Sequence, residues 1–476
     1  MGIVSSTAYV VGYVIGSGIF ISPSLILRQA GSVGLSLVVW VVCGMFSILS
    51  SLCYIELATS VRQSGSEFAY LYYVGWYPVA FGFVFSAGLF TVSMSNAVLC
   101  KAFAQYLGYG ARALSPELDE NSVLLAERFL EVGLILALAW ANFLPLSRYA
   151  AKFQVVTSVA KLFVIAVIVA TGFYLLVVKG RSENLANIWE GSNTNVGSFV
   201  LNCYSGIYAY AGAIVLTYGV DDIKNVKRTL PLATVCGVSI VIVAYLTINV
   251  SYFVVLSKKE IVESNAVAVT FSGKELGFFV YILPIAIGLL MSGTVNATLF
   301  HASRFLAASA SKGYLPTCFG LTHSLWHSPR FAILFHAVVC AASTFLGNLE
   351  ELILYQAYGS VLVSAAAMFA LLYIKLRRLP VHPEAIRFPL VVPLLFLSMQ
   401  LIVLGVPFYE NWIAPAISIV LFLIGLGGYF CFMVPKRLPR VLQLINEKFT
   451  IACQMLLDLD AFESKEREED RDKTEI

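Results

Sequence analysis

Long apolar runs alternate with short polar segments along almost the whole chain. A transmembrane helix needs about 20 mainly apolar residues to cross the hydrocarbon core of a bilayer. Twelve runs come close to this length, and they cover about residues 3–27, 33–58, 77–105, 122–145, 153–178, 196–220, 231–256, 277–300, 331–347, 352–374, 388–406 and 412–434. The pattern therefore predicts an all-α polytopic membrane protein with twelve transmembrane helices.

The composition of the 476 residues agrees with this pattern. Hydrophobic residues make up 59%, charged residues only 12%, and the mean hydropathy is +0.82. Soluble domains carry about 25% charged residues, so a water-soluble enzyme or regulator is excluded. The net charge is +3, and outside the C-terminal tail no basic block is dense enough to follow a phosphate backbone, so no nucleic acid partner is expected.

Cysteines and histidines are scattered singly through the sequence. The nine cysteines form no C-x-x-C pair, and the five histidines show no metal-ligand spacing. A membrane-embedded enzyme would need such groups gathered at one depth, and a channel would need repeated rings of polar residues. The sequence thus predicts no metal, no cofactor and no enzymatic activity.

The loops between the runs carry unequal numbers of basic residues. If the N-terminus is cytoplasmic, the inner loops hold more Lys and Arg than the outer side, on which Lys101 and Arg128 are counted. The positive-inside rule then predicts that both termini are cytoplasmic. No cleavable signal peptide is expected, because the first run leads into a glycine-rich stretch and Pro23 instead of a cleavage site.

The first apolar run is interrupted by glycines. Gly16 and Gly18 flank Ser17, and Gly12 precedes them by one turn. Glycine weakens a helix, and unwound backbone at membrane depth is tolerated where it lines a cavity or is buried in protein. The alternative interpretation is a packing face of small residues between two helices.

The sixth run contains a similar stretch. Residues 205–208 (Ser-Gly-Ile-Tyr) repeat the pattern of residues 17–20 (Ser-Gly-Ile-Phe) five helices later. Interrupted spans at matching positions of two halves indicate the midplane site of an inverted-repeat transporter. The free N–H groups of a half-helix attract an anion, and unwound carbonyls attract a cation. Such a site suits a zwitterion, which favours an α-amino acid.

Residues 15–20 resemble the first-helix signature of the amino acid-polyamine-organocation superfamily. More closely, the chain resembles the L-type amino acid transporters, the light subunits of heteromeric amino acid transporters. Further matches to this family occur in order along the chain, at residues 38–40, 53–57, 64–70, 204–206, 209–210, 230–233, 266–269, 295–300 and 315–316.

This resemblance implies a five-plus-five inverted-repeat fold with broken helices 1 and 6. Repeat one would cover about residues 3–178 and repeat two about 196–374, with two extra helices at about 388–434 and a cytoplasmic tail at 435–476. The implied activity is amino acid exchange or facilitated transport across the plasma membrane by alternating access.

The resemblance also implies roles for individual residues. The substrate carboxylate would be held by Gly16, Ser17, Gly18 and Ile19. The α-amine would face the carbonyls of Tyr204, Ser205 and Gly206, and Tyr208 would be the aromatic gate above the substrate.

Lys161 lies deep inside the fifth run, about 13 Å along the helix from Lys152. A charged residue at this depth is costly unless it is paired or faces a cavity, although a lysine can also snorkel to the surface. The resemblance places its ammonium where sodium-coupled relatives bind sodium. It therefore implies sodium-independent transport.

The chain departs from the family after Tyr210. The family usually has a small residue followed by Gly-Trp-Asn, whereas this chain has Ala211, Gly212, Ala213 and Ile214. The side-chain pocket lined by Ala211 and Ala213 should be roomier and more apolar. No residue from 201 to 220 is acidic, and burying an unpaired cationic side chain is expensive, so neutral substrates are favoured.

The loop at about 106–121 contains no cysteine, although light subunits use one there to join a glycoprotein partner by a disulfide. We therefore expect no disulfide-linked heavy chain, and a noncovalent partner is the alternative. Two alternatives to exchange also stay open. One is a receptor or scaffold that no longer transports, and the other is a proton-coupled symporter.

The tail carries two further signals. An apolar stripe suits the membrane surface, the protein's own inner face or, less well, a coiled coil, and it runs through Leu438, Leu442, Ile445, Phe449, Ala452, Leu456 and Leu459. The chain then ends with Thr474 two places before Ile476, the form of a PDZ-domain ligand that adds as a strand.

Overall fold

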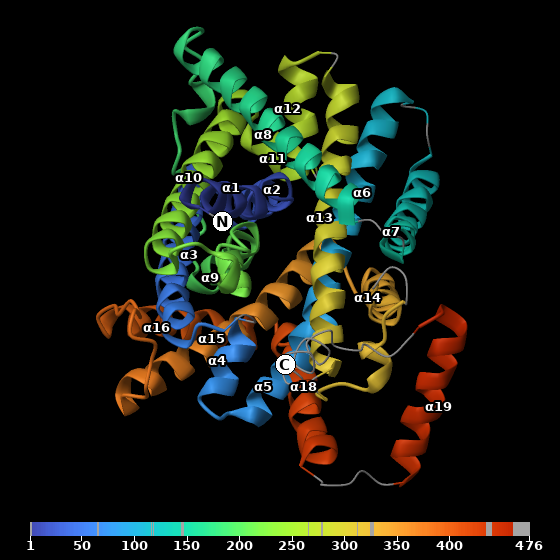
Figure 1. Ribbon diagram of the computed structural model, residues 1–476. Coiled ribbons are helices and arrows are strands. Elements are labelled where there is room, and N and C mark those ends of the chain that lie inside the picture. The colour runs from blue at the N-terminus through green and yellow to red at the C-terminus, as the bar shows by residue number, and fades with distance from the viewer. Residues whose placement is uncertain are drawn as a thin grey trace.

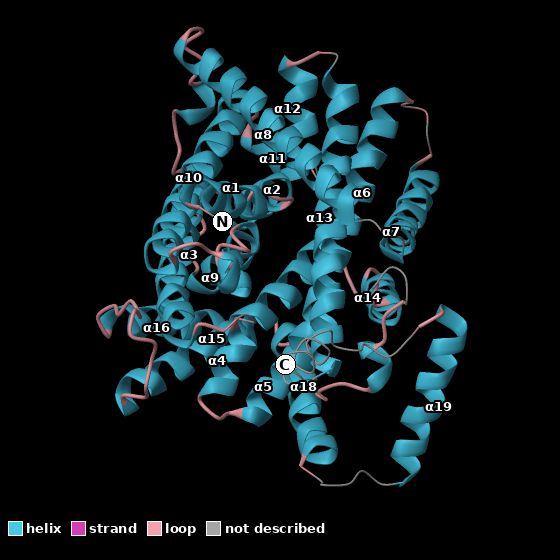
Figure 2. Cartoon of the chain, in the orientation of Figure 1, coloured by secondary structure: helices cyan, strands magenta, loops and turns pink. Residues whose placement is uncertain are grey.

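The computed structural model describes residues 2–63, 66–115, 117, 119–143, 147–264, 266–277, 279–311, 313–323, 328–434 and 440–459. Helices account for most of these residues, and Figure 2 shows no strand among them. The helices are α1 Ile3–Val14, α2 Gly18–Ala30, α3 Val33–Val61, α4 Glu67–Tyr73, α5 Tyr77–Phe83, η1 Val84–Thr91, α6 Val92–Leu114, α7 Glu120–Phe143, α8 Ser147–Val177, η2 Glu183–Leu185, α9 Val196–Ala209, η3 Val215–Asp222, α10 Val226–Val255, α11 Lys258–Glu263, α12 Val267–Glu275, α13 Phe279–Ser311, η4 Thr317–Gly320, α14 Arg330–Ser343, α15 Leu349–Arg377, α16 Val391–Gly405, α17 Pro407–Glu410, α18 Ile413–Gly428, η5 Tyr429–Met433 and α19 Arg440–Leu457. The predicted all-α class is confirmed.

The twelve predicted spans coincide with helices, but not all of them have the length and apolarity of a simple membrane span. Among the described residues, eight helices meet both conditions, and the bent pair α1 and α2 raises the number to nine. The other three predicted spans correspond to α7, which carries several charged residues, and to α9 and α14, which have 14 residues each. The chain is a multi-span membrane protein.

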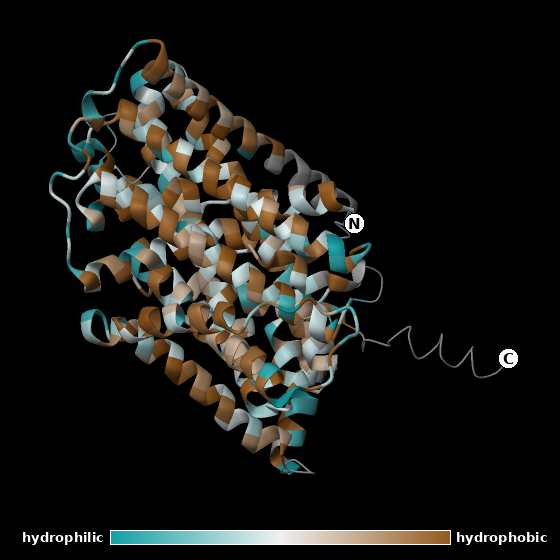
Figure 3. Ribbon diagram, turned by 90° about the vertical axis from the view of Figure 1, so that its left-hand side faces the viewer, coloured by the Kyte–Doolittle hydropathy of each residue, from teal (hydrophilic) through white to brown (hydrophobic). Residues whose placement is uncertain are grey.

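Apolar side chains cover much of the outer surface of the bundle. Trp140, Phe163 and Val243, for example, are more than 60% exposed. Exposed apolar area on this scale is costly in water and is expected of a surface that faces lipid. Figure 3 shows the same distribution, with hydrophobic residues along the helices and hydrophilic ones gathered in loops at the edges.

The helices are arranged around the interrupted first span. In Figure 1, α1 and α2 lie inside the bundle near α9, while α6 and α13 run side by side along it. The first span contacts α10 through α1 and α9 through α2. This arrangement places the glycine-rich break of the first span next to the sixth span.

An ion pair links the third helix to α15. Glu56 is 3% exposed, and it accepts a hydrogen bond from Lys375 Nζ and another from the backbone N–H of Phe388, at 3.2 Å. A buried carboxylate needs such partners, because burial without them would be very costly. Glu56 is therefore a structural residue that ties α3 to α15 and to the segment before α16.

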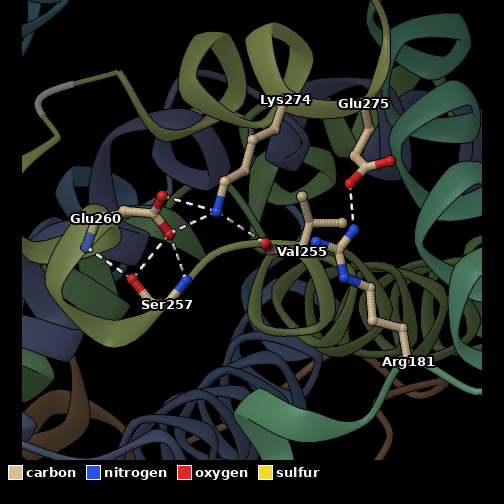
Figure 4. Close-up of polar contacts among 6 residues, drawn as sticks. All are labelled: Arg181, Val255, Ser257, Glu260, Lys274 and Glu275. Atoms are coloured by element: carbon tan, nitrogen blue, oxygen red, sulfur yellow. Dashed lines mark hydrogen bonds and ion pairs between the residues drawn. The ribbon is translucent and has the colours of Figure 1, made fainter.

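A polar cluster closes the connection between α10 and α13 (Figure 4). Ser257 and Glu260 form a capping box at the start of α11, and Lys274 of α12 lies 2.7 Å from the Glu260 carboxylate. Beside them, Arg181 after α8 pairs with Glu275 of α12. These contacts hold α11 and α12 together over the end of the bundle.

The Glu260 carboxylate is expected to make stability depend on pH. The hydrogen bond from Lys274, followed by those from Ser257, lowers the pKa of Glu260 from 4.5 to about 2. A lowered pKa stabilises the folded state above the unfolded-state pKa, and this contribution is lost as the pH falls through the folded pKa. The unfolding temperature of Glu260→Gln should therefore lie below that of the wild type by a constant amount from pH 5 to 8, and the gap should close as the pH falls toward 2. A gap that stayed the same at low pH would show that the carboxylate charge contributes nothing.

Candidate functional site

The first span is broken between Val14 and Gly18, where α1 and α2 meet at a bend of 50°. The Ser17 carbonyl accepts hydrogen bonds from the N–H groups of Phe20 at 2.9 Å and Ile21 at 3.0 Å. The Gly16 N–H is directed at the Tyr245 hydroxyl, and within the described part of the chain no acceptor bonds to the N–H groups of residues 17–19. They lie at the positive end of α2, so this break is suited to holding an anionic group.

Gly18 is required by the packing at this break. A Cβ atom built on Gly18 would lie 2.4 Å from Ala209 Cα and 2.9 Å from Ala209 Cβ. No real Cβ makes contacts this short, and the obstacle is backbone that cannot swing away. Glycine here therefore allows the broken first span to approach the end of α9 directly.

The sixth span breaks later than the sequence suggests. We predicted an interruption near Ser205 and Gly206, but these residues are helical, and α9 continues to Ala209 before an irregular turn leads to η3. Gly212 lies in this turn with φ of +95°, a conformation that glycine adopts without strain. Gly206 has a different role, since a Cβ there would lie 2.4 Å from Cys43 Sγ of α3. It permits close helix packing and does not break the helix.

Three hydrogen bonds join the two interrupted spans. The Ser17 and Tyr208 hydroxyls are 3.0 Å apart, and Ser22 Oγ donates to the Ser205 carbonyl at 2.9 Å. Farther along, Asn202 Nδ2 donates to the Ile26 carbonyl at 3.0 Å. The structure thus brings the Ser17 region, Ser205 and Tyr208 together, although they are almost 200 residues apart in sequence.

The other residues predicted to bind the α-amine, Tyr204 and Gly206, make no hydrogen bond to the first span among the described residues. Tyr204 is buried, and its hydroxyl donates to the Val403 carbonyl of α16 at 2.6 Å, away from the first span. The Gly206 carbonyl accepts from the Tyr210 N–H at 3.0 Å. The Ser205 carbonyl accepts from Ser22 Oγ and lies inside α9, where the helical N–H of Ala209 takes its second lone pair, whereas the Gly206 carbonyl keeps one lone pair for a further donor.

Lys161 of α8 points into the bundle. The residue is 2% exposed, and its Nζ donates to the Gly12 carbonyl in the last turn of α1 at 3.2 Å. The side chain does not snorkel to a membrane surface. Instead, the ammonium supplies a positive charge at the C-terminal end of α1, where the helix dipole favours a cation.

Two tyrosines at the site were missed from the sequence. The Tyr245 hydroxyl of α10 lies 2.9 Å from both the Val14 and the Ala209 carbonyls, so it contacts the last residue of α1 and of α9. The ring of Tyr13 covers Gly212, where an added Cβ would meet Tyr13 Cδ1 at 2.4 Å. A tyrosine inside an apolar run needs a partner for its hydroxyl, and this was the signal that could have identified Tyr245.

The predicted pocket residues lie in the turn after α9. Ala211 is exposed and Ala213 is 5% exposed, so only the first faces open space. Most of the site is covered: Ser17 and Tyr208 are 6% and 7% exposed, and Ile19 is fully buried. This arrangement offers backbone donors and hydroxyls shielded from water, which can bind a small polar solute.

Two other expectations concern chemistry outside this site. Among the described residues, no group of three His, Cys, Asp or Glu side chains is placed to hold a metal ion. The predicted PDZ ligand, with Thr474 and Ile476, lies outside the described residues.

Comparison with known proteins identifies the family to which the chain is similar. The amino acid permease family model matches residues 1–446. The chain is 36% identical to amino acid transporter protein 6 of Caenorhabditis elegans over 465 residues, which are 96% of this chain and 88% of that protein. It is 30% identical to the human cystine/glutamate transporter over 461 residues (96% and 89%), and 29% identical to the human b(0,+)-type amino acid transporter 1 over 462 residues (96% and 92%).

Proposed function

The chain belongs to the amino acid permease family, its activity is therefore amino acid transport and not enzymatic catalysis, and on this premise we propose that it exchanges neutral L-amino acids without sodium. The observation that supports this proposal best is the approach of the two interrupted spans. Free N–H groups at the start of α2 suit a carboxylate, and the Gly206 carbonyl of the sixth span, which keeps one lone pair, suits an ammonium. The two groups of an α-amino acid would thus be bound by main chain, in agreement with the resemblance to light subunits.

Neutral substrates follow from the charges around the turn after α9. No acidic residue occurs from 201 to 220, and Ala211 offers no partner to a cationic side chain. An unpaired charge in such a place would carry a large desolvation cost. The relatives include a cystine/glutamate transporter, so an anionic substrate is the second class to test.

Sodium independence follows from Lys161. Its ammonium already occupies the Gly12 carbonyl, and a fixed positive charge disfavours a sodium ion nearby. The protein would lie in the plasma membrane with both termini in the cytoplasm. The first repeat would end at about residue 178, and the second would begin at about residue 196. We also propose that no disulfide-linked heavy chain is needed, because the loop at 106–121 lacks a cysteine.

Transport by the purified chain in liposomes tests these proposals together. Uptake of a labelled large neutral amino acid should require an internal amino acid and should be unchanged when choline replaces sodium. Uptake driven by an inward proton gradient without internal substrate would instead establish a symporter. Well-folded protein that binds no amino acid and transports none would favour a receptor or scaffold.

Removing the Tyr208 hydroxyl should weaken substrate binding. Tyr208→Phe deletes the contact that positions Ser17, and a neutral hydrogen bond contributes about 0.5–1.5 kcal/mol. We expect KM to rise by roughly 2- to 10-fold in the uptake assay, in line with that energy. Tyr252→Phe is the matched control, because the buried Tyr252 hydroxyl makes no hydrogen bond within the described structure. Equal KM values for Tyr208→Phe and the wild type would contradict a role for this hydroxyl.

The C-terminus is proposed to bind a PDZ-domain scaffold through Thr474 and Ile476. Deletion of the last three residues should abolish co-precipitation with PDZ modules. Co-precipitation that survives the deletion would eliminate this proposal.

A further inference from the structure

The C-terminal helix α19 turns its apolar face away from the protein. Its large apolar residues Val441, Leu444, Ile445, Met455 and Leu456 are each at least 50% exposed, and Met455 and Leu456 reach 82%. Phe449 and Ile451 are exposed to 50% and 53%, and seven exposed side chains of this kind on one 18-residue helix would be costly in water. Something apolar must therefore cover this face.

The opposite face of α19 contacts the bundle and is more polar. Thr317 of η4 bonds to the hydroxyl of Thr450 at 2.7 Å and to Asn446 Oδ1 at 3.3 Å. Cys453 is buried in the same contact, in a cluster with Phe319 of η4. The helix is thus oriented opposite to an ordinary surface helix, which would bury its apolar side against the protein.

The end of α19 is fixed to the start of α14. Arg330 donates to the Leu457 carbonyl at 2.6 Å, and His323 Nε2 lies 3.1 Å from the Asp458 carboxylate. Phe331 and Phe449 pack edge to face at 5.6 Å. These contacts determine which side of α19 faces outward.

Helical geometry separates the two faces clearly. At about 100° per residue, Asn446, Thr450, Cys453 and Leu457 fall within about 60° of one another. The exposed apolar residues fall on the other side of the helix, with Lys448 among them. An amphipathic helix with a long cationic side chain on its apolar side can extend the amine to a lipid headgroup.

The position of α19 in the chain limits what can cover it. Only residues 434–439 separate it from η5, the end of the last span, and six residues reach at most about 22 Å. Figure 1 shows α19 at the edge of the bundle next to α14, which also presents an exposed apolar residue, Val338. The apolar face of α19 thus continues the lipid-facing surface of the spans beside it.

We propose that α19 is an interfacial helix whose apolar face is embedded in the acyl chains of the leaflet at the end of the last span. Its polar face remains bound to η4 and to the start of α14. Lipid covers the apolar face. The helix therefore links the membrane surface to the segment that connects α13 and α14.

Site-specific photo-crosslinking of the full chain tests this proposal. Benzoylphenylalanine is introduced at Leu444 or Met455 on the apolar face, and at Gln443 or Glu447 on the polar flank as matched controls. All four positions are exposed, so each variant should fold, which a single symmetric peak in size-exclusion chromatography verifies. The variants are reconstituted in vesicles of phosphatidylcholine and phosphatidylserine and then illuminated.

Mass spectrometry of the products separates the possible occupants. We expect phospholipid adducts from positions 444 and 455 and none from positions 443 and 447. Crosslinks from position 455 to a second copy of the chain would overturn the proposal, as would lipid adducts that are equally frequent at all four positions. Absence of lipid adducts from both 444 and 455 in folded protein would also overturn it.

Discussion

Replacing Gly18 with alanine is expected to abolish transport while leaving the protein folded. The added Cβ would lie 2.4 Å from Ala209 Cα, whereas ordinary contacts begin near 3.4 Å. Spans 1 and 6 would have to separate by about 1 Å at the point where the N–H groups of α2 are presented, and a displacement of this size can cost roughly 100-fold in rate. The measurement is amino acid uptake into liposomes.

Gly133→Ala is the control for this experiment. Gly133 also lies in a helix, α7, but a Cβ there would meet nothing within 4 Å. This variant should transport like the wild type, and both variants should elute as single species in detergent. Uptake by Gly18→Ala within about twofold of the wild type would show that the close contact with Ala209 does not shape the site.

Of the variants proposed here, Glu131→Gln is expected to lower the free energy of unfolding most. Glu131 of α7 and Lys101 of α6 are 4% and 3% exposed, with Nζ and Oε1 3.8 Å apart, and Arg128 lies 3.0 Å from the other carboxylate oxygen. Glu131→Gln would leave the Lys101 ammonium buried without its counter-charge. Breaking a buried pair from one side costs about 3–5 kcal/mol. Denaturant unfolding in mixed micelles would measure this change in the free energy of unfolding.

Two further variants identify the cause of this loss. Lys259 and Glu263 form an exposed pair 3.9 Å apart, and Glu263→Gln should change stability by less than about 1 kcal/mol. In the double variant Lys101→Met with Glu131→Met, no buried charge is left unpaired, and the half-exposed Arg128 keeps its hydrogen bond to the Thr344 carbonyl, so much of the stability should return. A double variant as unstable as Glu131→Gln would attribute the loss to packing instead of charge.

The sequence predicted the spans and the first break because both depend on local properties. Apolar runs must be helical in a bilayer, and glycines on both sides of Ser17 weaken a helix wherever it lies. The second break was misplaced because Gly206 resembles Gly18 in sequence but meets Cys43 of α3 in space. The sequence alone did not show which glycine serves packing and which serves a break.

Polar contacts between residues far apart in the chain could not be predicted from the sequence either. Lys101 was counted among the residues of the outer side, yet it is buried beside Glu131, because α6 and α7 pack together there. The apolar run around Tyr245 indicates that its hydroxyl needs a partner, but it does not show that the partners are the Val14 and Ala209 carbonyls. In contrast, the depth of Lys161 within its apolar run was enough to predict that its ammonium is buried.

The hydrogen bonds between the two interrupted spans have a mechanical consequence. Ser17 with Tyr208, Ser22 with the Ser205 carbonyl, and Asn202 with the Ile26 carbonyl join α2 to α9 at three levels. A rotation of one helix must carry the other with it, since separating them would break all three bonds together. The two helices are therefore coupled, and any movement of α2 is expected to be transmitted to α9.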